Sequence, residues 1–484
     1  MSKATARSLV FFASAAVLVL EILAGRMMAP YVGVTLETWT GIIGTILAGI
    51  SIGSWLGGRL ADRYPPQHVL PLVLMAGGGL ALLAFPMVRL VGPSAGSEPF
   101  DIVFLAAVSF FAPAAVLSAV TPTVTKIRLE TLSETGTVVG RLSAISTAGA
   151  IFGTFLAGFV LVAAWPSRTI TVILGLTLIA TGVGLAVKGR MATTGLLATA
   201  ALLTIGAGAA AVAAPSSCDY ETAYFCVNVE VDPERDSGRI LWLDTLRHSY
   251  VDLDDPTYLE FRYAQIFAAV LDSHLPTGPA SSLSIGGGGF TFPQYVAVTH
   301  PGGTNTVLEI DPALVDIAEE QLGLDPDSYD ILTGDARLTL RETDLAGYDV
   351  VIGDAFGGPA VPWHLTTREF VEEFAARLTT DGFYVLNLID YPPLGFARAQ
   401  TVTLAEVFEH VAVIAPADYL AGETGGNFVL VASNREIEAA AIRNELIRRE
   451  SSARVITGDA VPIFVGDAEV LTDDFAPVDQ LITN

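Results

Sequence analysis

The sequence predicts a bundle of membrane-spanning helices followed by a small β-domain and an α/β domain of the Rossmann-like, methyltransferase type. Three observations lead to this prediction. The chain has 484 residues and a mean hydropathy of +0.53, so it is too long for one domain and too apolar to be wholly soluble. Long apolar segments fill the first 214 residues, and short strands alternate with helices after residue 276. The expected domains are 1–214, 215–275 and 276–484.

Seven apolar segments of the first domain are long enough to cross a bilayer, which takes about 20 residues each. They are 8–29, 39–57, 68–91, 101–121, 142–164, 169–187 and 193–214. Their glycines (Gly44, Gly49, Gly53, Gly149, Gly153 and Gly158) are expected to allow close helix packing. Glu21, inside the first segment, is a candidate functional residue, because ionisable groups are costly in a membrane. Thr38 or Ser51 is a possible partner for it.

Basic residues between the segments predict the orientation of the bundle. Nine fall on one side, namely Lys3, Arg7, Arg59, Arg63, Lys126, Arg128, Arg141, Lys188 and Arg190. Three fall on the other side, namely Arg26, Arg89 and Arg168. The positive-inside rule therefore predicts a multi-pass protein of the cell membrane with a cytoplasmic N-terminus, and seven crossings would place the C-terminal domain outside. Cys218 and Cys226 either form a disulfide there or are two buried thiols.

Charge divides sharply between the two parts of the chain. Residues 1–214 carry 12 Lys and Arg against 7 Asp and Glu, whereas residues 215–484 carry 14 Arg, no Lys and 44 Asp and Glu. An acid-rich domain without lysine repels nucleic acid, so no nucleic-acid partner is expected. The composition indicates a solvated acidic surface of the halophilic type, suited to high salt. No cluster of the kind that binds zinc is found in the sequence, so no metal is expected.

The second half begins with strand-like stretches up to residue 252, followed by an amphipathic helix expected over Pro256–Val270. Alternating elements of a doubly wound sheet come next. The expected strands are Leu283–Ile285, Thr306–Ile310, Asp330–Thr333, Tyr348–Gly353 and Phe383–Asp390. The expected helices are Phe292–Thr299, Pro312–Leu322, Arg337–Thr343 and Thr367–Leu378.

A ligand site is expected at the carboxyl ends of these strands. Gly286, Gly287, Gly288 and Gly289 follow the first strand, and such glycines let a backbone approach a ligand closely. Acidic residues end the next strands: Glu309, Asp335 and Asp354. An acid at the tip of the second strand can accept hydrogen bonds from ribose hydroxyls. The pattern predicts a nucleoside-binding domain.

At these residues the chain resembles the spermidine synthase family, specifically its membrane-fused members. The likeness covers nearly all of 219–434. It includes YETAY (220–224), the stretch Gly238–Asp244, LEFRY (259–263), the glycine loop, EID (309–311), GDA (334–336), DAFGGPAVPWHLTTREF (354–370) and PADYLAGETGGNFVLVAS (416–433). It implies an aminopropyltransferase of polyamine biosynthesis, with decarboxylated S-adenosylmethionine as co-substrate and a small amine as acceptor. A homodimer is one possible assembly.

The resemblance also implies roles for single residues. Glu309 would bind the ribose, and Asp335, with Ala336 beside it, the adenine amino group. The four glycines would hold the methionine-derived part, and Asp354 would orient or deprotonate the attacking amine, as a carboxylate in a partly dry cleft can. Tyr224, Tyr263 and Tyr419 would line the amine site.

Departures from the family pattern leave other readings open. Gly289 and Gly357 stand where the family has acids, Phe225 where it has a glutamine, and Ala264 follows the second tyrosine. Asp252, Asp254, Asp255 and Asp390 are either substitutes or, as we prefer, surface acids. His248, His364 and Trp363 are expected to serve packing or capping. The alternatives to aminopropyl transfer are an S-adenosylmethionine-dependent methyltransferase acting on a lipid or membrane acceptor, and a non-catalytic transport or sensor protein.

Overall fold

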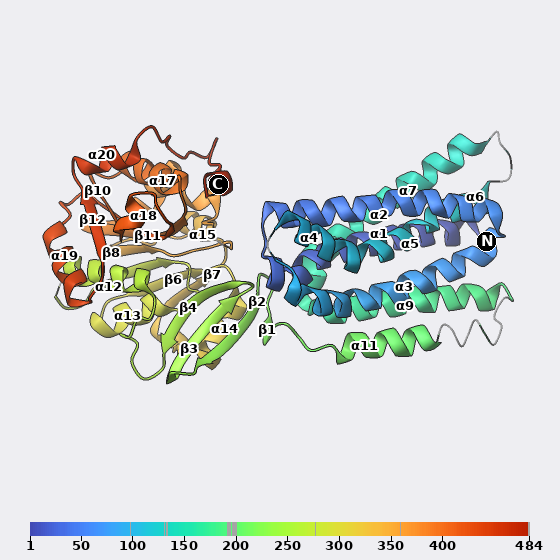
Figure 1. The fold of residues 1–484 in the computed structure, drawn as a ribbon, viewed down its shortest axis with the longest axis horizontal. Helices are drawn as coiled ribbons and strands as arrows, with labels where there is room; N and C mark the ends of the chain where they lie inside the picture. The colour runs from blue at the N-terminus through green and yellow to red at the C-terminus, as the bar shows by residue number, and fades with distance from the viewer. Residues whose placement is uncertain are drawn as a thin grey trace. The chain divides into compact units, whose positions relative to one another are not determined.

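The computed structural model describes residues 1–96, 98–129, 131, 134–190, 195, 201–275, 277–358 and 360–482. The chain divides into two compact units, Met1–Val227 and Asn228–Asn484. The boundary falls inside strand β2 (Cys226–Asp232). The first unit is helical and the second is a mixed α/β fold (Figure 1).

In the described residues, six helical stretches are long and apolar enough to cross a membrane. They are Lys3–Val32 (α1), Leu36–Arg63 (α2), Pro66–Ser94 (α3 and η1), Pro99–Arg128 (α4, η2, α5 and α6), Thr135–Ala164 (α7, η4 and α8) and Ser167–Lys188 (α9). The expected seventh segment, 193–214, lies partly outside the described residues. Its described end forms η5 (Leu203–Ala207) and α11 (Gly208–Ala213), a shorter apolar helix.

Helix α1 is central to the bundle, since it contacts α2, α3, α5, α6, α7 and α9. Small residues make its close contacts possible, as expected. A Cβ added at Gly149 of α7 would come within 2.2 Å of the Phe11 carbonyl oxygen, and one at Gly153 within 2.4 Å of that of Ala15. Gly49 and Gly53 of α2 press against α5 in the same way. A Cβ added at Gly44 or Gly158 would meet no other helix within 4 Å, so the packing interpretation is wrong for these two.

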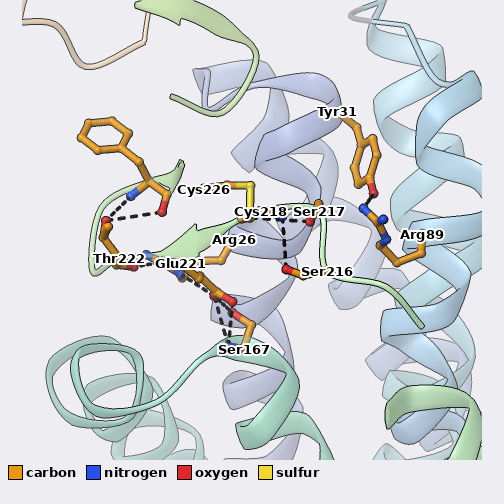
Figure 2. The surroundings of a disulfide bond; sticks show 11 residues. Arg26, Tyr31, Arg89, Ser167, Ser216, Ser217, Cys218, Glu221, Thr222 and Cys226 are labelled. Carbon is orange, nitrogen blue, oxygen red and sulfur yellow. Dashed lines mark hydrogen bonds and ion pairs between the residues drawn. A yellow bond between two sulfur atoms is a disulfide. The ribbon is translucent and has the colours of Figure 1, made fainter. Parts of the chain in front are cut away.

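A disulfide joins Cys218 to Cys226 and closes a loop that contains strand β1 (Tyr220–Glu221) (Figure 2). The Arg26 guanidinium donates to the carbonyl oxygens of Thr222 and Ala223, and its Nε lies 3.5 Å from the Glu221 carboxylate. That carboxylate also accepts from the backbone N–H (3.1 Å) and the hydroxyl of Ser167, at the start of α9. The loop is therefore bound to the ends of α1 and α9.

A four-stranded antiparallel sheet has the order β1-β2-β3-β4, with β3 at Arg235–Leu243 and β4 at Leu246–Asp252. Helix α12 follows at Arg262–His274, six residues later than the expected start at Pro256. The expectation was wrong there because Asp252 and Asp255 accept hydrogen bonds from the backbone N–H groups of residues 254, 255 and 257, which folds this stretch into turns.

The larger sheet has eight strands in the order β12-β10-β11-β9-β8-β5-β6-β7. Its parallel part consists of β5 (Ser282–Ile285), β6 (Asn305–Glu309), β7 (Asp330–Thr333), β8 (Tyr348–Gly353) and β9 (Leu378–Asp390). The antiparallel part consists of β10 (His410–Pro416), β11 (Gly426–Ser433) and β12 (Ala453–Thr457). The doubly wound sheet expected from the sequence is thus confirmed, with three antiparallel strands added at one edge.

Helices cover both faces of this sheet, and two apolar clusters fill the space beneath them. The helices are α13 (Thr291–Thr299), α14 (Pro312–Gln321), α15 (Ala336–Glu342), α16 (Arg368–Ala375), α17 (Gly395–Ala405), α18 (Ala417–Leu420), α19 (Ala439–Arg448), α20 (Ala460–Val465) and α21 (Val478–Ile482). Strands β5 and β8 and the second half of β9 are buried on both faces of the sheet, although β5 alternates serine with leucine and isoleucine.

Candidate active site

The order of the parallel strands fixes where a ligand can bind. From β5 the chain adds β6 and β7 on one side and then returns to add β8 and β9 on the other. Sheets of this kind bind ligands in the crevice at such a reversal, outside the carboxyl ends of the strands. Here that crevice lies between the ends of β5 and β8, which carry the glycine loop and Asp354.

The glycine loop packs directly on the Asp354 backbone. The Asp354 N–H donates to the Ile285 carbonyl at 3.0 Å. Gly286 has φ +94°, and a Cβ on it would come within 2.6 Å of the Asp354 carbonyl oxygen. Only glycine fits both the left-handed backbone and this close approach. The first glycine of the loop therefore brings the two strand ends together.

Glu309, at the end of β6, is buried behind the same loop. Its Oε2 accepts from the backbone N–H groups of Gly287 (2.8 Å) and Gly288 (3.1 Å), and its Oε1 from that of Asp311 (2.9 Å). Burial raises the pKa of Glu309, and these three N–H groups act in the opposite direction. The carboxylate thus fixes the shape of the glycine loop.

Asp354, at the end of β8, is a strongly perturbed acid that faces a cavity. Its Oδ1 accepts from the Asn387 amide of β9 at 2.9 Å, and the Tyr263 hydroxyl of α12 also bonds to it. The Asn387 oxygen accepts in turn from the Asn427 amide of β11 at 3.0 Å. Burial raises the pKa of Asp354 to about 6, although both hydrogen bonds lower it. A carboxyl group with this pKa is poised to take up a proton near neutral pH.

A cavity of about 530 Å³ opens in front of Asp354. Aromatic and amide side chains form much of its wall, namely Phe261, Tyr263, Phe356, Asn387, Tyr419 and Asn427. Charged side chains are Arg247, Glu260, Arg262 and Glu450, beside His248. The Arg247 guanidinium lies 3.9 Å from Glu260. The cavity is large enough for a small flexible substrate next to the carboxyl group.

The predicted adenine residues lie at the start of α15. Asp335 caps this helix, since its Oδ1 accepts from the Leu338 N–H at 3.0 Å, and Ala336 is the buried first residue of the helix. The other Asp335 oxygen pairs with His364 Nε2 at 2.8 Å. His364 therefore positions the Asp335 side chain instead of serving packing alone.

The predicted tyrosines are placed differently from one another. Tyr263 and Tyr419 both line the cavity that contains Asp354. Tyr224 belongs to the first unit, where its ring is 46% exposed and lies near that of Phe225. Trp363 is 51% exposed, so the expectation that it packs in the core is wrong.

The four remaining acids fall into two classes. Asp254 and Asp255 are exposed, as expected. Asp252 and Asp390 are fully buried, so the surface interpretation is wrong for them. Asp252 pairs with Arg235, and Asp390 accepts from the backbone N–H groups of Tyr391 and Ala397. Both are therefore used within the fold.

His248 and Ser249 of β4 lie beside the glycine loop. The Ser249 hydroxyl accepts from the Gly289 N–H at 3.1 Å and bonds to His248 Nδ1 at 2.8 Å. A Cβ at Gly289 would come within 2.6 Å of the Ser249 Cβ, so an acid has no room there. Burial lowers the pKa of His248 to about 4, which leaves the imidazole neutral. His248 thus lines the site, which the packing interpretation did not foresee.

Sequence reasoning missed Asn387 and Asn427 altogether. Asn387 was visible as one amide inside the apolar stretch FYVLNLID. A buried amide in a central strand needs a partner, and this requirement was the available signal. Among the described residues, no group of three or more His, Cys, Asp or Glu side chains could hold a metal ion.

Comparison with solved structures identifies the fold. A probable spermidine synthase from Corynebacterium glutamicum ATCC 13032 is 30% identical, with a TM-score of 0.50, and the match covers 54% of this chain and 97% of that one. The chain belongs to the spermidine synthase family. Strands β5 to β9 with the glycine loop are thus this family's α/β fold, preceded in the described part of the chain by six helical stretches long and apolar enough to cross a membrane.

Two curated family members are similar over shorter regions. The polyamine aminopropyltransferase of Vibrio vulnificus is 38% identical over 112 residues, which is 22% of this chain and 38% of that protein. The polyamine aminopropyltransferase of Chromobacterium violaceum is 27% identical over 141 residues, 29% of this chain and 53% of that protein. The chain therefore matches about half or less of the length of each. No family model matches the chain.

Proposed function

We propose that this protein is a membrane-bound aminopropyltransferase that uses decarboxylated S-adenosylmethionine and an amine acceptor, with Asp354 as the base. The main support is the Asp354 carboxyl group, which faces a cavity, is held by Asn387 and Tyr263, and has a pKa of about 6. Similarity to two polyamine aminopropyltransferases and a probable spermidine synthase supports the reaction class.

The proposed reaction is a direct displacement. The neutral amine nitrogen attacks the propyl carbon next to the sulfonium, a C–N bond forms, and the C–S bond breaks. Its electron pair returns to sulfur, so methylthioadenosine leaves as a neutral thioether. The nitrogen loses one proton, which Asp354 accepts. A base held near the nucleophile and a fixed nucleophile–carbon geometry are the two contributions that the protein makes.

The chain's own residues suggest how the co-substrate is held. Glu309 lies at the tip of β6, where family resemblance gives it the ribose, and its carboxylate retains acceptor capacity beyond three N–H bonds. Asp335, held by His364, is the candidate for the adenine amino group. Tyr263 and Tyr419 would enclose the alkyl chain of the amine between aromatic faces.

Methyl transfer from intact S-adenosylmethionine is the second candidate, and the wall around Gly289 favours it. Ser249 and a neutral His248 occupy the place where the family pattern has an acid. Gly357 leaves a second acid missing. The ammonium end of an aminopropyl group would thus meet less negative charge than the family pattern implies.

Calorimetry on the full chain separates the two candidates. We expect decarboxylated S-adenosylmethionine to bind at least tenfold more tightly than the intact form, and Asp354→Asn to keep this binding while losing transfer to a diamine. Tighter binding of the intact form would favour methyl transfer instead. If the Asp354→Asn protein turned over at the wild-type rate, the carboxylate would have no part in the mechanism.

We also propose that the second unit lies outside the cytoplasm. Met1, His68 and Lys188 line one cavity, and Lys126 pairs with Asp62, so the basic segment ends meet at one end of the bundle. At the other end, Arg168 donates to the carbonyl oxygens of Val212 and Ala214, and the disulfide loop contacts Arg26 and Ser167 (Figure 2). The positive-inside rule and a disulfide support the same assignment.

Cysteine labelling tests this orientation. Both native cysteines are disulfide-bonded, so a cysteine introduced at exposed Arg443 provides the free thiol. A membrane-impermeant maleimide should label Arg443→Cys in intact cells and Arg63→Cys, at the basic end, only after lysis. Labelling of Arg63→Cys alone in intact cells would reverse the orientation.

A further inference from the structure

Glu21 lies far inside α1, the longest single helix among the described residues. It is 18 residues after Lys3 and 11 before Val32, so about 27 Å and about 17 Å of helix separate it from the two ends of α1. Among the described residues it has no hydrogen bond or ion pair. The candidates from the sequence are engaged or exposed: the Thr38 hydroxyl donates to the Gly33 carbonyl, and Ser51 faces outward.

Arg26, the nearest arginine on the same helix, also binds other groups. Arg26 donates to the carbonyl oxygens of Thr222 and Ala223 and lies beside Glu221 (Figure 2). A carboxyl group without a partner in the hydrocarbon region is costly, and such groups mark ligand or ion sites by default. Glu21 therefore needs an explanation that the described residues do not supply.

A cavity of about 240 Å³ lies next to this position, between α1, α2, α5, α6 and α7. Ser14, Val17 and Leu18 of α1 line it. Glu21 is seven, four and three residues later, which places it on the same face of the helix. Glu21 is half-buried and stands one turn beyond the residues of α1 that line the cavity. Because helical side chains lean toward the N-terminus, we place its carboxyl group toward this turn.

Half of the residues that line the cavity carry a hydroxyl group, and the other half are apolar. The hydroxyl residues are Ser14, Ser54, Ser118, Thr121, Ser146 and Thr147. The Ser14 and Ser146 hydroxyls lie 2.7 Å apart and join α1 to α7. Six alanine and branched aliphatic side chains complete the wall. Hydroxyl oxygens accept hydrogen bonds from an ammonium group, and apolar side chains suit a methylene chain.

From this arrangement we infer that the helical unit holds its own binding site for a protonated alkylamine, with Glu21 as the counter-charge and the hydroxyl groups as acceptors. A hydrated metal cation fits less well, because half of the wall offers no oxygen. The inference rests on the membrane insertion proposed above but not on the transfer reaction. It gives the helices a role in handling the class of compound that the second unit is proposed to use.

Equilibrium binding of radiolabelled 1,4-diaminobutane to the full chain in nanodiscs tests the site. Glu21→Gln preserves side-chain volume and removes the charge, so we expect the affinity at one site per chain to fall about tenfold or more. Ser146→Leu fills the cavity and should have the same effect. The matched controls are Glu37→Gln, an exposed acid in the first turn of α2, and Thr177→Leu, an exposed hydroxyl residue on α9.

Calorimetric binding of the nucleoside co-substrate shows that the second unit of each variant is folded, and an unchanged helical circular dichroism signal shows the same for the first unit. Wild-type diamine binding by Glu21→Gln, in a protein that keeps nucleoside binding, would overturn the inference. If sodium chloride displaced the radiolabelled diamine as well as unlabelled diamine does at equal concentration, the alkylamine assignment would be overturned. Asp354→Asn separates this site from the transfer reaction, because it should abolish turnover and leave the Glu21-dependent binding in place. Loss of that binding in Asp354→Asn would contradict the inference as well.

Discussion

Replacing Asp354 with asparagine should stabilise the second unit while it abolishes turnover. The pKa of this carboxyl group rises from 3.8 to about 6 on folding. At about 1.4 kcal/mol per pH unit, the burial of the charged form costs about 3 kcal/mol at neutral pH. Asparagine has nearly the same shape, can accept from Asn387 and can donate to Tyr263, so it avoids this cost without losing its partners.

The sign of the pH dependence follows from the raised pKa. Between pH 3.8 and about 6 the folded protein binds more protons at this group than the unfolded chain, so stability falls as the pH rises through this window. The advantage of Asp354→Asn should therefore be about 3 kcal/mol at pH 7 and below about 1 kcal/mol at pH 4. For a domain of this size it corresponds to a rise in melting temperature of about 6 to 12 °C at pH 7.

Differential scanning calorimetry of the full chain at pH 4 and pH 7 measures this difference. Asp390→Asn is the matched comparison, because burial also raises the pKa of Asp390 to about 6. Both Asp390 oxygens accept from backbone N–H groups, so an asparagine NH₂ group would face a donor and cost about 1 to 3 kcal/mol. We expect no net gain there. An Asp354→Asn protein that melts at the wild-type temperature at pH 7 would refute the reasoning.

Three further predictions concern other contacts. Asn387→Leu removes the amide that stabilises ionised Asp354, so the acidic limb of the pH profile of kcat should move above pH 6. Comparison with wild type cancels the ionisation of the amine substrate, and an unchanged profile would assign the acidic limb to another group. In Glu309→Gln the side-chain NH₂ group must face a backbone N–H group, so the co-substrate affinity measured by calorimetry should fall about tenfold. An unchanged affinity would show that Glu309 is not part of the binding site. Serine at both Cys218 and Cys226 should lower the free energy of unfolding of the first unit by about 2 kcal/mol. Dithiothreitol should lower the melting temperature of the wild type by the same amount and leave that of the double variant unchanged. If neither change had an effect, the disulfide would be absent in solution.

Much of the site was visible as pattern. Four glycines after one strand and an acid after each of the next three predict a crevice at the carboxyl edge, because parallel strands end at the same edge. Strands Asp330–Thr333 and Tyr348–Gly353 have the predicted bounds. The sequence pattern could not show the surroundings of each acidic side chain. Asp354 and Asp390 look alike in sequence, yet one faces a cavity and the other binds backbone N–H groups.

Sequence pattern alone predicted the helical first half, the alternation of strands and helices in the second half, and the family resemblance, because these depend on hydropathy, periodicity and local motifs. The tertiary structure decided which residues meet across long separations. Asn387 and Asn427 reach Asp354 only because β9 and β11 are neighbours, and His364 reaches Asp335 across 29 positions. It also decided that Arg26 binds the disulfide loop and that Glu21 has no partner among the described residues, since the partners of a charged group are set by packing between elements, which local sequence does not encode.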